Sequence, residues 1–180
     1  WFINIGLRFD NFKFQYSDKK TAEYYTASKY QNTLSPKLNI VYNVSDKFQI
    51  YAKFGKSFHS NDARVVVSNY SLSTLPYALG SDLGINWQPF PRFIVNAAVW
   101  YMYLEEELVW SGDGGTWEPS EQTRRLGLDL SLRWQVWKSL YFDTDVNLCV
   151  ARYIDLPDGA NYIPLSPKIS STGGLNYKYS

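Results

Sequence analysis

The chain has 180 residues, enough for one domain, and its 18 Lys and Arg against 17 Asp and Glu leave a net charge of +1. This balance gives no electrostatic argument for a nucleic-acid partner. The unusual quantity is an aromatic content of 18%, combined with a mean hydropathy of only −0.33. Large rings interleaved with polar residues suit an element that has two unlike faces.

Helical membrane spans are excluded, because no stretch approaches the roughly 18 consecutive apolar residues that such a helix requires. Strands that cross a membrane carry a much weaker sequence signal, so this observation does not exclude them. The first residues, Trp1-Phe2-Ile3-Asn4, read as the interior of a strand and not as a signal peptide. We therefore expect the chain to begin within a structure.

The first segment alternates apolar and polar residues from position 1 to position 9, which is the period of a strand. The phase then slips at Asp10-Asn11, and aromatic residues continue on the other parity from Phe12 to Tyr16. One added residue exchanges the two faces of a strand, so we expect a β-bulge at this point.

Seven further segments with the same period are predicted as strands, at 37–44, 47–54, 79–88, 92–103, 125–136, 140–150 and 168–179. The clearest of these, 125–136, places four leucines on one face against Arg125, Asp129 and Arg133 on the other. Comparable short motifs open strands at 35–37, 80–82, 127–129 and 166–168. About one hairpin separates successive motifs, and each repeat holds two long strands, unlike the four short strands of a propeller blade.

The connections alternate between short turns and long polar loops. The short turns lie at 44–47, 88–92 and 136–139, and the long loops at 17–35, 59–78, 105–123 and 155–166. Outer-membrane barrels show this alternation, and their strands need roughly 9–11 residues. Aromatic residues expected at the membrane interface gather near the short turns: Tyr42, Phe48, Trp87, Phe90, Phe93, Trp134, Trp137 and Tyr141.

Charged residues in the predicted strands are sorted onto one face. Those expected to point into a barrel lumen include Arg125, Asp129, Arg133, Asp143 and Asp145. A Lys or Arg that faces lipid at the midplane costs about 2–4 kcal/mol, so a lipid-facing stripe explains the sorting. The lumen charges are predicted to pair across strands or to contact whatever fills the barrel. The fold class is therefore all-β, an antiparallel up-and-down meander of about eight long strands.

Four stretches in order resemble the barrel portion of the TonB-dependent outer-membrane receptors. They are SPKLNIVYNVSDKFQIYAKFGKSF, YALGSDLGINWQPFPRFIVNAAVWYMYLEEELV, RRLGLDLSLRWQ and IPLSPKISSTGGLNYKY, and together they cover most of residues 34–180. The family usually has Glu-Leu-Gly near Gly80-Ser81-Asp82 and Arg-Gly-Val-Glu near Gly127-Leu128-Asp129. These departures leave the subfamily open.

The resemblance implies a fragment, residues 1–180, of a large barrel of roughly 22 strands. It implies TonB-energised uptake of a scarce nutrient, such as a ferric siderophore, cobalamin or an oligosaccharide, across the outer membrane of a Gram-negative-type bacterium. The implied partners are the bilayer and its outer-leaflet lipopolysaccharide, the receptor's own plug domain and remaining strands, TonB and the nutrient. The plug, the TonB-contacting segment and the terminal strands are expected outside this chain, and the lumen charges could contact that plug.

Catalytic and metal-binding patterns are weak. The one histidine, His59, has Ser57, Ser60 and Asp62 nearby, which is an ordinary loop composition, and we expect no enzyme, cofactor or metal site. The acidic run 105–107 could hold a divalent cation, although a solvated loop start is the simpler interpretation. Loop residues that could contact a ligand are His59, Arg64, Tyr70, Tyr77, Trp110 and Trp117, since aromatic rings stack on sugars and siderophore rings.

Three other interpretations remain open on the sequence alone. A complete small eight-stranded outer-membrane barrel would have a structural or adhesive role. A soluble lipocalin-like barrel would turn its apolar stripe inward, which the alternation of turns and loops disfavours. An outer-membrane enzyme is the third. Unpaired edges invite pairing, so the segment is expected either as an open curved sheet or as a smaller closed barrel.

Overall fold

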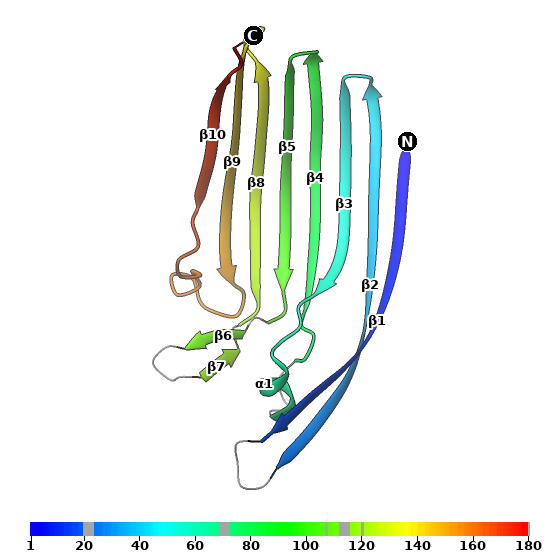
Figure 1. Cartoon of the computed structure of the whole chain (residues 1–180), viewed down its shortest axis with the longest axis vertical. Coiled ribbons are helices and arrows are strands. Elements are labelled where there is room, and N and C mark those ends of the chain that lie inside the picture. The colour runs from blue at the N-terminus through cyan, green and yellow to red at the C-terminus, as the bar shows by residue number, and fades with distance from the viewer. Residues whose placement is uncertain (20–23, 69–72, 107, 112–115, 120, 180) are drawn as a thin grey trace.

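The computed structural model is an open, curved antiparallel sheet in which eight long strands follow one another (Figure 1). It describes residues 1–19, 24–68, 73–106, 108–111, 116–119 and 121–179. The order in the sheet is β1-β2-β3-β4-β5-β8-β9-β10, so β1 and β10 are the two edges. The strand bounds are β1 Phe2–Asp18, β2 Tyr25–Ser45, β3 Phe48–Phe58, β4 Tyr77–Phe90, β5 Phe93–Leu104, β8 Thr123–Gln135, β9 Leu140–Tyr153 and β10 Ile169–Tyr177.

The predicted meander is confirmed, and the sheet is open because its two edge strands do not pair with each other. Short turns join the strands at one end of the sheet, and the long connections lie at the other (Figure 1). Two long connections contain small elements of their own. Helix α1 (Ala63–Ser68) lies between β3 and β4, and the hairpin of β6 (Leu108–Ser111) and β7 (Thr116–Pro119) lies between β5 and β8.

The register sorts the side chains onto two faces. One row of paired residues across six strands is apolar: Tyr42, Ile50, Ile85, Ala97, Leu130 and Val146. The next row is mostly polar or small: Val41, Tyr51, Gly84, Ala98, Asp129 and Asn147. Residues of the second set line a hollow shared by β3, β4, β5, β8, β9 and β10, so their side of the sheet is concave. We call this side the inner face and the apolar side the outer face.

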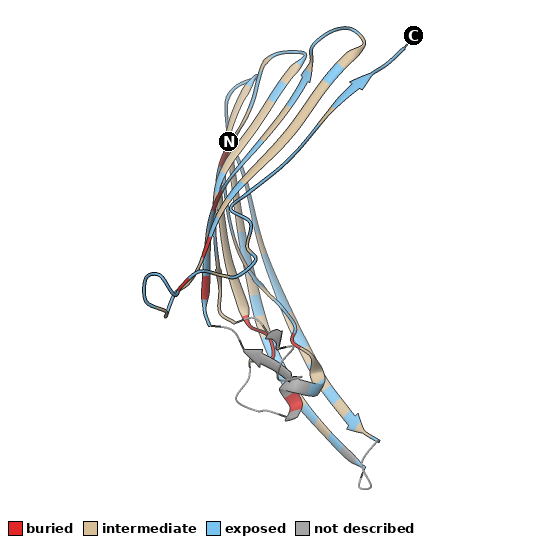
Figure 2. Cartoon of the chain, turned by 90° about the vertical axis from the view of Figure 1, so that its left-hand side faces the viewer, coloured by how far each residue is buried: buried red, intermediate tan, exposed pale blue. Residues whose placement is uncertain are grey.

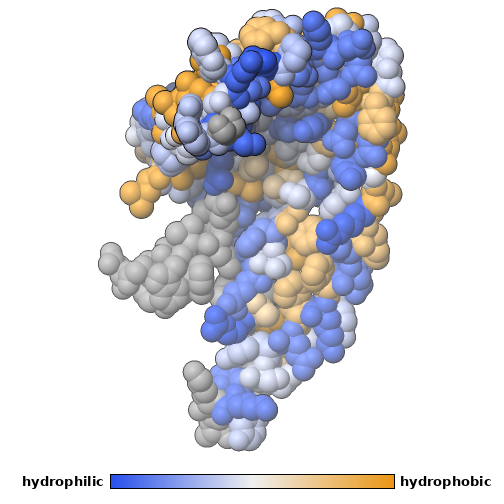
Figure 3. Space-filling model, turned by 45° about the horizontal axis from the view of Figure 1, so that its top comes forward, coloured by the Kyte–Doolittle hydropathy of each residue, from blue (hydrophilic) through white to orange (hydrophobic). Residues whose placement is uncertain are grey.

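In the part of the chain that the structure describes, no second layer covers the outer face. Large apolar side chains there stay exposed, such as Leu126 at 53% and Val150 at 51%, and Figure 3 shows apolar atoms along the outside of the arc. Among the described residues the buried hydrophobic ones are only Val67, Leu75 and Ala151, and Figure 2 shows how little of the sheet is buried. A continuous exposed apolar face of this kind marks a membrane or a partner surface. No helix in the described part of the chain is long and apolar enough to cross a membrane.

The bulge predicted at Asp10-Asn11 is wrong. The β1–β2 ladder runs without a shift from Phe2↔Val41 to Asp18↔Tyr25. The apolar residues change face because the surroundings of the strand change. Beyond Asp10 the inner face lies under the segment that contains α1, and α1 packs against β1 and β2.

The loop predicted at 17–35 is also mostly strand, because β2 begins at Tyr25. Most side chains of residues 25–34 are polar or aromatic on both faces, so the sequence shows no apolar period of two that would predict a strand. The ladder with β1 holds them in an extended conformation. Register shifts do occur next to two short turns, between Asn43 and Ser45 and between Trp87 and Phe90.

Candidate functional site

The inner face contains a broad hollow of about 750 Å³ at mid-height. Most of the polar side chains around it come from inner-face positions on six strands: Lys53, Asp82, Asn96, Asp129, Asp145, Asn147 and Thr172. Lys53 and Asp82 are register partners on adjacent strands, where opposite charges attract. The alternation of the strands therefore produces a polar surface that a hydrated ligand or a second domain could contact.

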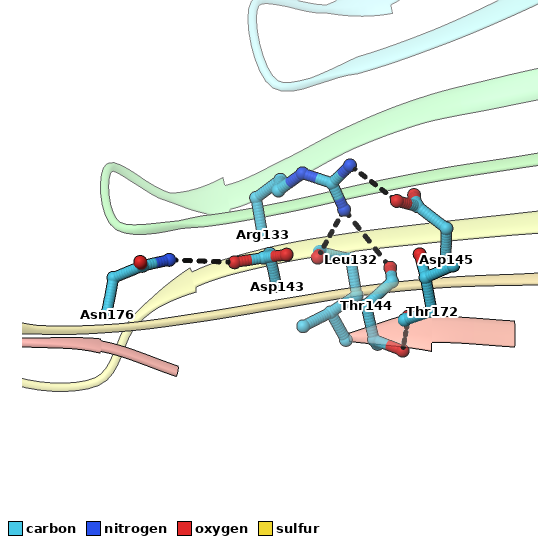
Figure 4. A network of polar contacts seen from close by, with 7 residues as sticks. All are labelled: Leu132, Arg133, Asp143, Thr144, Asp145, Thr172 and Asn176. Atoms are coloured by element: carbon cyan, nitrogen blue, oxygen red, sulfur yellow. Dashed lines mark hydrogen bonds and ion pairs between the residues drawn. The ribbon is translucent and has the colours of Figure 1, made fainter. Parts of the chain in front are cut away.

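One polar network joins β8, β9 and β10 on this face (Figure 4). Arg133 donates from Nη2 to Asp145 Oδ2 at 2.8 Å, and from Nη1 to the carbonyls of Leu132 and Thr144 at 2.9 and 3.1 Å. Asn176 Nδ2 donates to Asp143 Oδ1 at 3.2 Å. The side chains of Arg133 and Asp145 are 45% and 48% exposed, so this ion pair adds little stability. The donors Arg133 and Asn176 orient the carboxylates of Asp145 and Asp143, respectively.

Large rings on the inner face lie against glycines of the neighbouring strand. A Cβ at Gly84 would overlap the Tyr51 ring, and a Cβ at Gly127 would overlap the Trp100 indole. Trp100 Nε1 donates to Asp129 Oδ1 at 3.0 Å, which holds the indole along the wall. Sequence reasoning missed these pairs, because only the cross-strand register shows which glycine faces which ring. The result is a wall whose rings do not project far into the lumen.

A second hollow of about 740 Å³ lies near the long-loop end, where β2 and β3 part. Its lining is basic and aromatic: Arg8, Phe12, Lys37, Lys56, Phe58 and His59. Arg8 pairs with Asp10 at 2.8 Å, and its Cζ lies 5.7 Å from the Phe58 ring centroid. Lys37 leaves the lining basic, so this hollow suits an anionic group.

The two described parts of the connection between β3 and β4, residues 59–68 and 73–76, contact each other at the long-loop end. His59 N donates to the Pro76 carbonyl at 3.0 Å, and Asn61 Nδ2 donates to the Ser73 carbonyl at 2.8 Å. Arg64 Nη2 lies 2.6 Å from Asp62 Oδ2. This hydrogen bond is the main reason that the pKa of Asp62 lies below its ordinary value.

The acidic run that follows β5 contacts the start of β4. Tyr77 N donates to Glu105 Oε2 at 3.0 Å. Burial raises the pKa of Glu106, and the charge of Glu105 adds to this effect. The described residues contain no group of three His, Cys, Asp or Glu side chains that could hold a metal ion. The geometry therefore assigns this run a structural contact with the start of β4.

The whole chain, residues 1–180, matches the family model described as "TonB dependent receptor-like, beta-barrel". The chain belongs to the TonB-dependent receptors. Solved structures of low identity share its fold. The ferric citrate transporter FecA is 19% identical with a TM-score of 0.79, over 98% of this chain and 28% of that one. The ferric-catecholate import receptor Fiu of E. coli K12 is 19% identical with a TM-score of 0.72, over 99% of this chain and 30% of that one.

The ferric yersiniabactin uptake receptor FyuA of Yersinia pestis is 16% identical with a TM-score of 0.73, over 97% of this chain and 28% of that one. This chain therefore spans less than a third of the length of these structural relatives. A comparison with curated proteins found no match. TonB-dependent receptors are outer-membrane transporters and not enzymes, and the predicted segment of a large barrel is confirmed.

In this receptor segment the predicted ligand residues do not form one cluster. His59 lines the basic hollow, and Arg64 lies in α1 against Asp62. Tyr77 lies on the outer face, with its ring 5.6 Å from that of Tyr103. Trp110 and Trp117 are register partners in the β6–β7 hairpin, where only the backbone is described, and Tyr70 lies outside the described residues.

The predicted lumen charges occupy inner-face positions in this receptor segment. Arg133, Asp143 and Asp145 share the network of Figure 4, and Asp129 lies at the mid-height hollow. Arg125 lies two inner-face positions nearer the long loops than Asp129, opposite Met102 and Ala151. The sequence period was sufficient to place all five on one face.

Most of the predicted interface aromatics occupy outer-face positions near the short turns of the wall. Phe90 and Phe93 stack at 5.2 Å, Phe93 meets Trp134 edge-on at 6.0 Å, and Trp1 stacks on Tyr42 at 4.4 Å. Phe48 and Trp87 are register partners, and Trp137 lies in a turn with 72% exposure. Tyr141 differs, because it pairs with inner-face Gln135, whose Nε2 donates to the Tyr141 hydroxyl at 3.3 Å. Phe142 takes the outer-face position beside it, opposite Trp134.

Proposed function

We propose that this chain forms part of the barrel wall of a receptor that imports a scarce nutrient across the outer membrane with energy supplied through TonB. The observation that supports this most directly is the match of the entire chain to the receptor family. The polar inner face with its two hollows below the long loops agrees with it. The nutrient classes considered are ferric siderophores, cobalamin and oligosaccharides.

A ferric siderophore is the first cargo to test. The names of several structural relatives specify ferric ligands. The basic lining of the loop-side hollow, with Arg8 and Lys37, is complementary to an anionic ferric complex. Neither point is specific to one siderophore, so the experiment has to compare classes of ligand.

The remaining partners follow from the same proposal. In the complete receptor, a plug domain would face the inner-face charges. These are Arg125, Asp129, Arg133, Asp143 and Asp145, of which Arg125 lies nearest the long loops. TonB would bind through a segment outside this chain, and the outer face would contact the bilayer and its outer-leaflet lipopolysaccharide. Six residues in or next to the long loops stay candidates for ligand contact: His59, Arg64, Tyr70, Tyr77, Trp110 and Trp117. The outer-face position of Tyr77 makes it the weakest of the six.

The test is uptake by cells in which the gene for the complete receptor is deleted. Radiolabelled iron complexes, cobalamin and oligosaccharides are supplied in turn, with a tonB deletion as the reference. We expect one ligand to lose its high-affinity uptake to the same extent in both strains. Unchanged uptake of every ligand in the receptor deletion would contradict the proposal and favour the structural or adhesive role of a small barrel.

A second experiment addresses the loop residues in the full-length receptor. The double substitution Trp110→Ala and Trp117→Ala should weaken ligand binding, because the two Cα atoms are opposed in a hairpin of the long connection between β5 and β8. Unchanged ligand affinity would remove both residues from the site. The matched control is Trp137→Ala, since Trp137 lies at the opposite end of the wall.

A further inference from the structure

Two arginines stand directly opposite each other on the outer face of the wall. Arg124 of β8 is the register partner of Arg152 of β9. Arg124 also pairs with Tyr103 of β5, and Arg152 forms an isolated bridge with Tyr162 on its other side. The strands β5, β8 and β9, with the bridge residue in the connection to β10, thus present one row in the order Tyr103, Arg124, Arg152 and Tyr162.

This row lies at the long-loop edge of the apolar outer face. The outer-face residues two positions nearer the short turns are Leu126 and Val150, which are also register partners. Both are about half exposed, at 53% and 51%, as expected of side chains that meet lipid. The arginines therefore lie where the apolar surface ends and the long loops begin.

The Arg–Arg pair is unfavourable by itself, because like charges directly opposite on one face of a sheet repel. Arg152 places its Cζ 3.7 Å from the Tyr162 ring centroid, and Lys168 Nζ lies 5.8 Å from the same ring. The guanidinium is thus held by the ring in a region that already contains a second arginine and a lysine. An anion shared between the two guanidinium groups would convert the repulsion into attraction.

The rest of the outer face shows the same bias. Among the outer-face residues of the eight described strands, the charged ones are Lys13, Lys56, Arg124 and Arg152, and none is a carboxylate. All four lie toward the long-loop ends of their strands. Lys13 Nζ lies 5.6 Å from the Tyr30 ring and Lys56 Nζ lies 5.0 Å from the Tyr77 ring. By contrast, inner-face charges of both signs occur at several heights.

We propose that Tyr103, Arg124, Arg152 and Tyr162 form a binding site for a phosphate group of the phosphorylated glycolipid in the outer leaflet, with Lys168 beside it. Each guanidinium offers a planar fork of donors that matches phosphate oxygens. The long-loop end of an outer-membrane barrel is the extracellular end, so the phosphates at this height belong to that glycolipid. The apolar surface below the row would contact its acyl chains.

This inference requires the outer-membrane placement of the family but not the proposed cargo. A failure of the uptake experiment would leave it standing, and a failure of lipid binding would leave uptake standing. The two experiments therefore test separate statements about the same wall.

The experiment uses the full-length receptor in a neutral detergent, titrated with bisphosphorylated lipid A and followed by native mass spectrometry. The double variant Arg124→Gln and Arg152→Gln should bind lipid A about tenfold more weakly, because two charge-assisted contacts are lost. The matched control, Lys138→Gln with Lys178→Gln, removes the same charge from the short-turn end of the wall and should bind like the parent protein. Equal affinity in the parent and the double variant would overturn the proposal.

The single variant Arg124→Gln separates a lipid site from a structural role. In phosphatidylcholine vesicles it should leave the thermal unfolding temperature unchanged or raise it, since a repulsive pair is removed. In vesicles that also contain lipid A it should lower that temperature relative to the parent. A loss of stability of the same size in both vesicles would show a structural role and contradict the proposal.

Two lipid comparisons define the source of the phosphate. Dephosphorylated lipid A should lose the difference between the parent and the double variant. Phosphatidylglycerol vesicles should stabilise the parent less than lipid A vesicles of equal charge. An equal effect of phosphatidylglycerol would overturn the assignment to the glycolipid, and binding that persists without phosphate would overturn the phosphate site itself.

Discussion

The β1–β2 hairpin consists of two lengths with the same backbone and opposite surfaces. Near the short-turn end the outer face carries Ile3, Ile5, Leu7 and Phe9, while the inner face carries Asn4 and Arg8. From Asn11 onward the outer face is polar and the inner face carries Phe12, Phe14 and Tyr16. The ladder is unbroken across the change. Binary patterning therefore reports what surrounds a strand, and a phase change does not require a bulge.

The two surroundings explain the exchange. The outer face of the distal length is covered by polar cross-strand pairs, such as Asn11 Nδ2 donating to Asn32 Oδ1 at 2.6 Å. Phe12, on the inner face, meets the ring of Phe58 at the end of β3 edge-on at 5.5 Å, and α1 packs against both strands with Val67 fully buried. The first length has an exposed apolar outer face, and the second has a polar outer face and a small core of its own on the inner side.

We infer that the position of the exchange marks the membrane boundary. The apolar outer stripe of β2 runs from Leu34 to Val44, which matches the roughly 9–11 residues that a membrane strand needs. Leu34 pairs with Phe9, the last apolar outer-face residue of β1. The eight residue pairs beyond, from Asn11↔Asn32 to Asp18↔Tyr25, extend the hairpin by about 27 Å.

The largest expected effect comes from placing a charge on the outer face of each region. Leu128→Arg lies at mid-height on the outer face and should lower the free energy of unfolding in vesicles by about 2–4 kcal/mol. Asn32→Arg, on the outer face of the distal length, should change it by less than about 0.5 kcal/mol. Urea unfolding of the full-length receptor in phosphatidylcholine vesicles gives both values. Equal costs would contradict a boundary between the two regions.

A smaller effect is expected from the inner face of the distal length. Phe12→Ala removes an aromatic contact with Phe58 and should destabilise the docking of residues 59–76 by about 1–3 kcal/mol. The readout is the rate of protease cleavage within 59–76 in the folded receptor, which should rise.

Phe9→Ala is the control for this change, because Phe9 is 65% exposed on the opposite face. Its cleavage rate should equal that of the parent protein. If both variants, or neither, release the segment, the inner face of the distal length does not hold it.

Much of the wall could be predicted from the sequence, because the outer apolar stripe obeys a strict period of two wherever lipid is the neighbour. The period gave no help at residues 25–34, where both faces of β2 are polar or mixed. The period does place Tyr141 on the inner face, where its hydroxyl accepts from Gln135, and only its position near a short turn suggested an interface aromatic. The pairs Tyr51–Gly84 and Trp100–Gly127 depend on register between strands, which one strand's pattern does not encode.

The smallest expected effect concerns pH and the segment 59–76. The Arg64 hydrogen bond lowers the pKa of Asp62 in the folded state, so the contact stabilises the segment at pH values above the unfolded pKa. This stabilisation should be lost as the pH falls through the lowered pKa of the folded state. Protease cleavage within 59–76 should then increase at acid pH in the parent protein.

Asp62→Asn should remove that part of the pH dependence, since the amide does not titrate. The unfolding of the wall in the same samples should not respond to this substitution. A pH profile that is identical in the parent and in Asp62→Asn would assign the acid response to another group.

The boundary itself can be measured by spin labels along β1. Single cysteines at outer-face positions 3, 5, 7, 9, 11, 13, 15 and 17 are introduced into the full-length receptor with Cys149→Ser, labelled, and reconstituted into vesicles. We expect high accessibility to oxygen and low accessibility to a water-soluble nickel complex at 3–9, and the reverse at 11–17. Lipid-like accessibility that continues through position 17, or water-like accessibility at positions 5 and 7, would contradict the membrane boundary between Phe9 and Asn11.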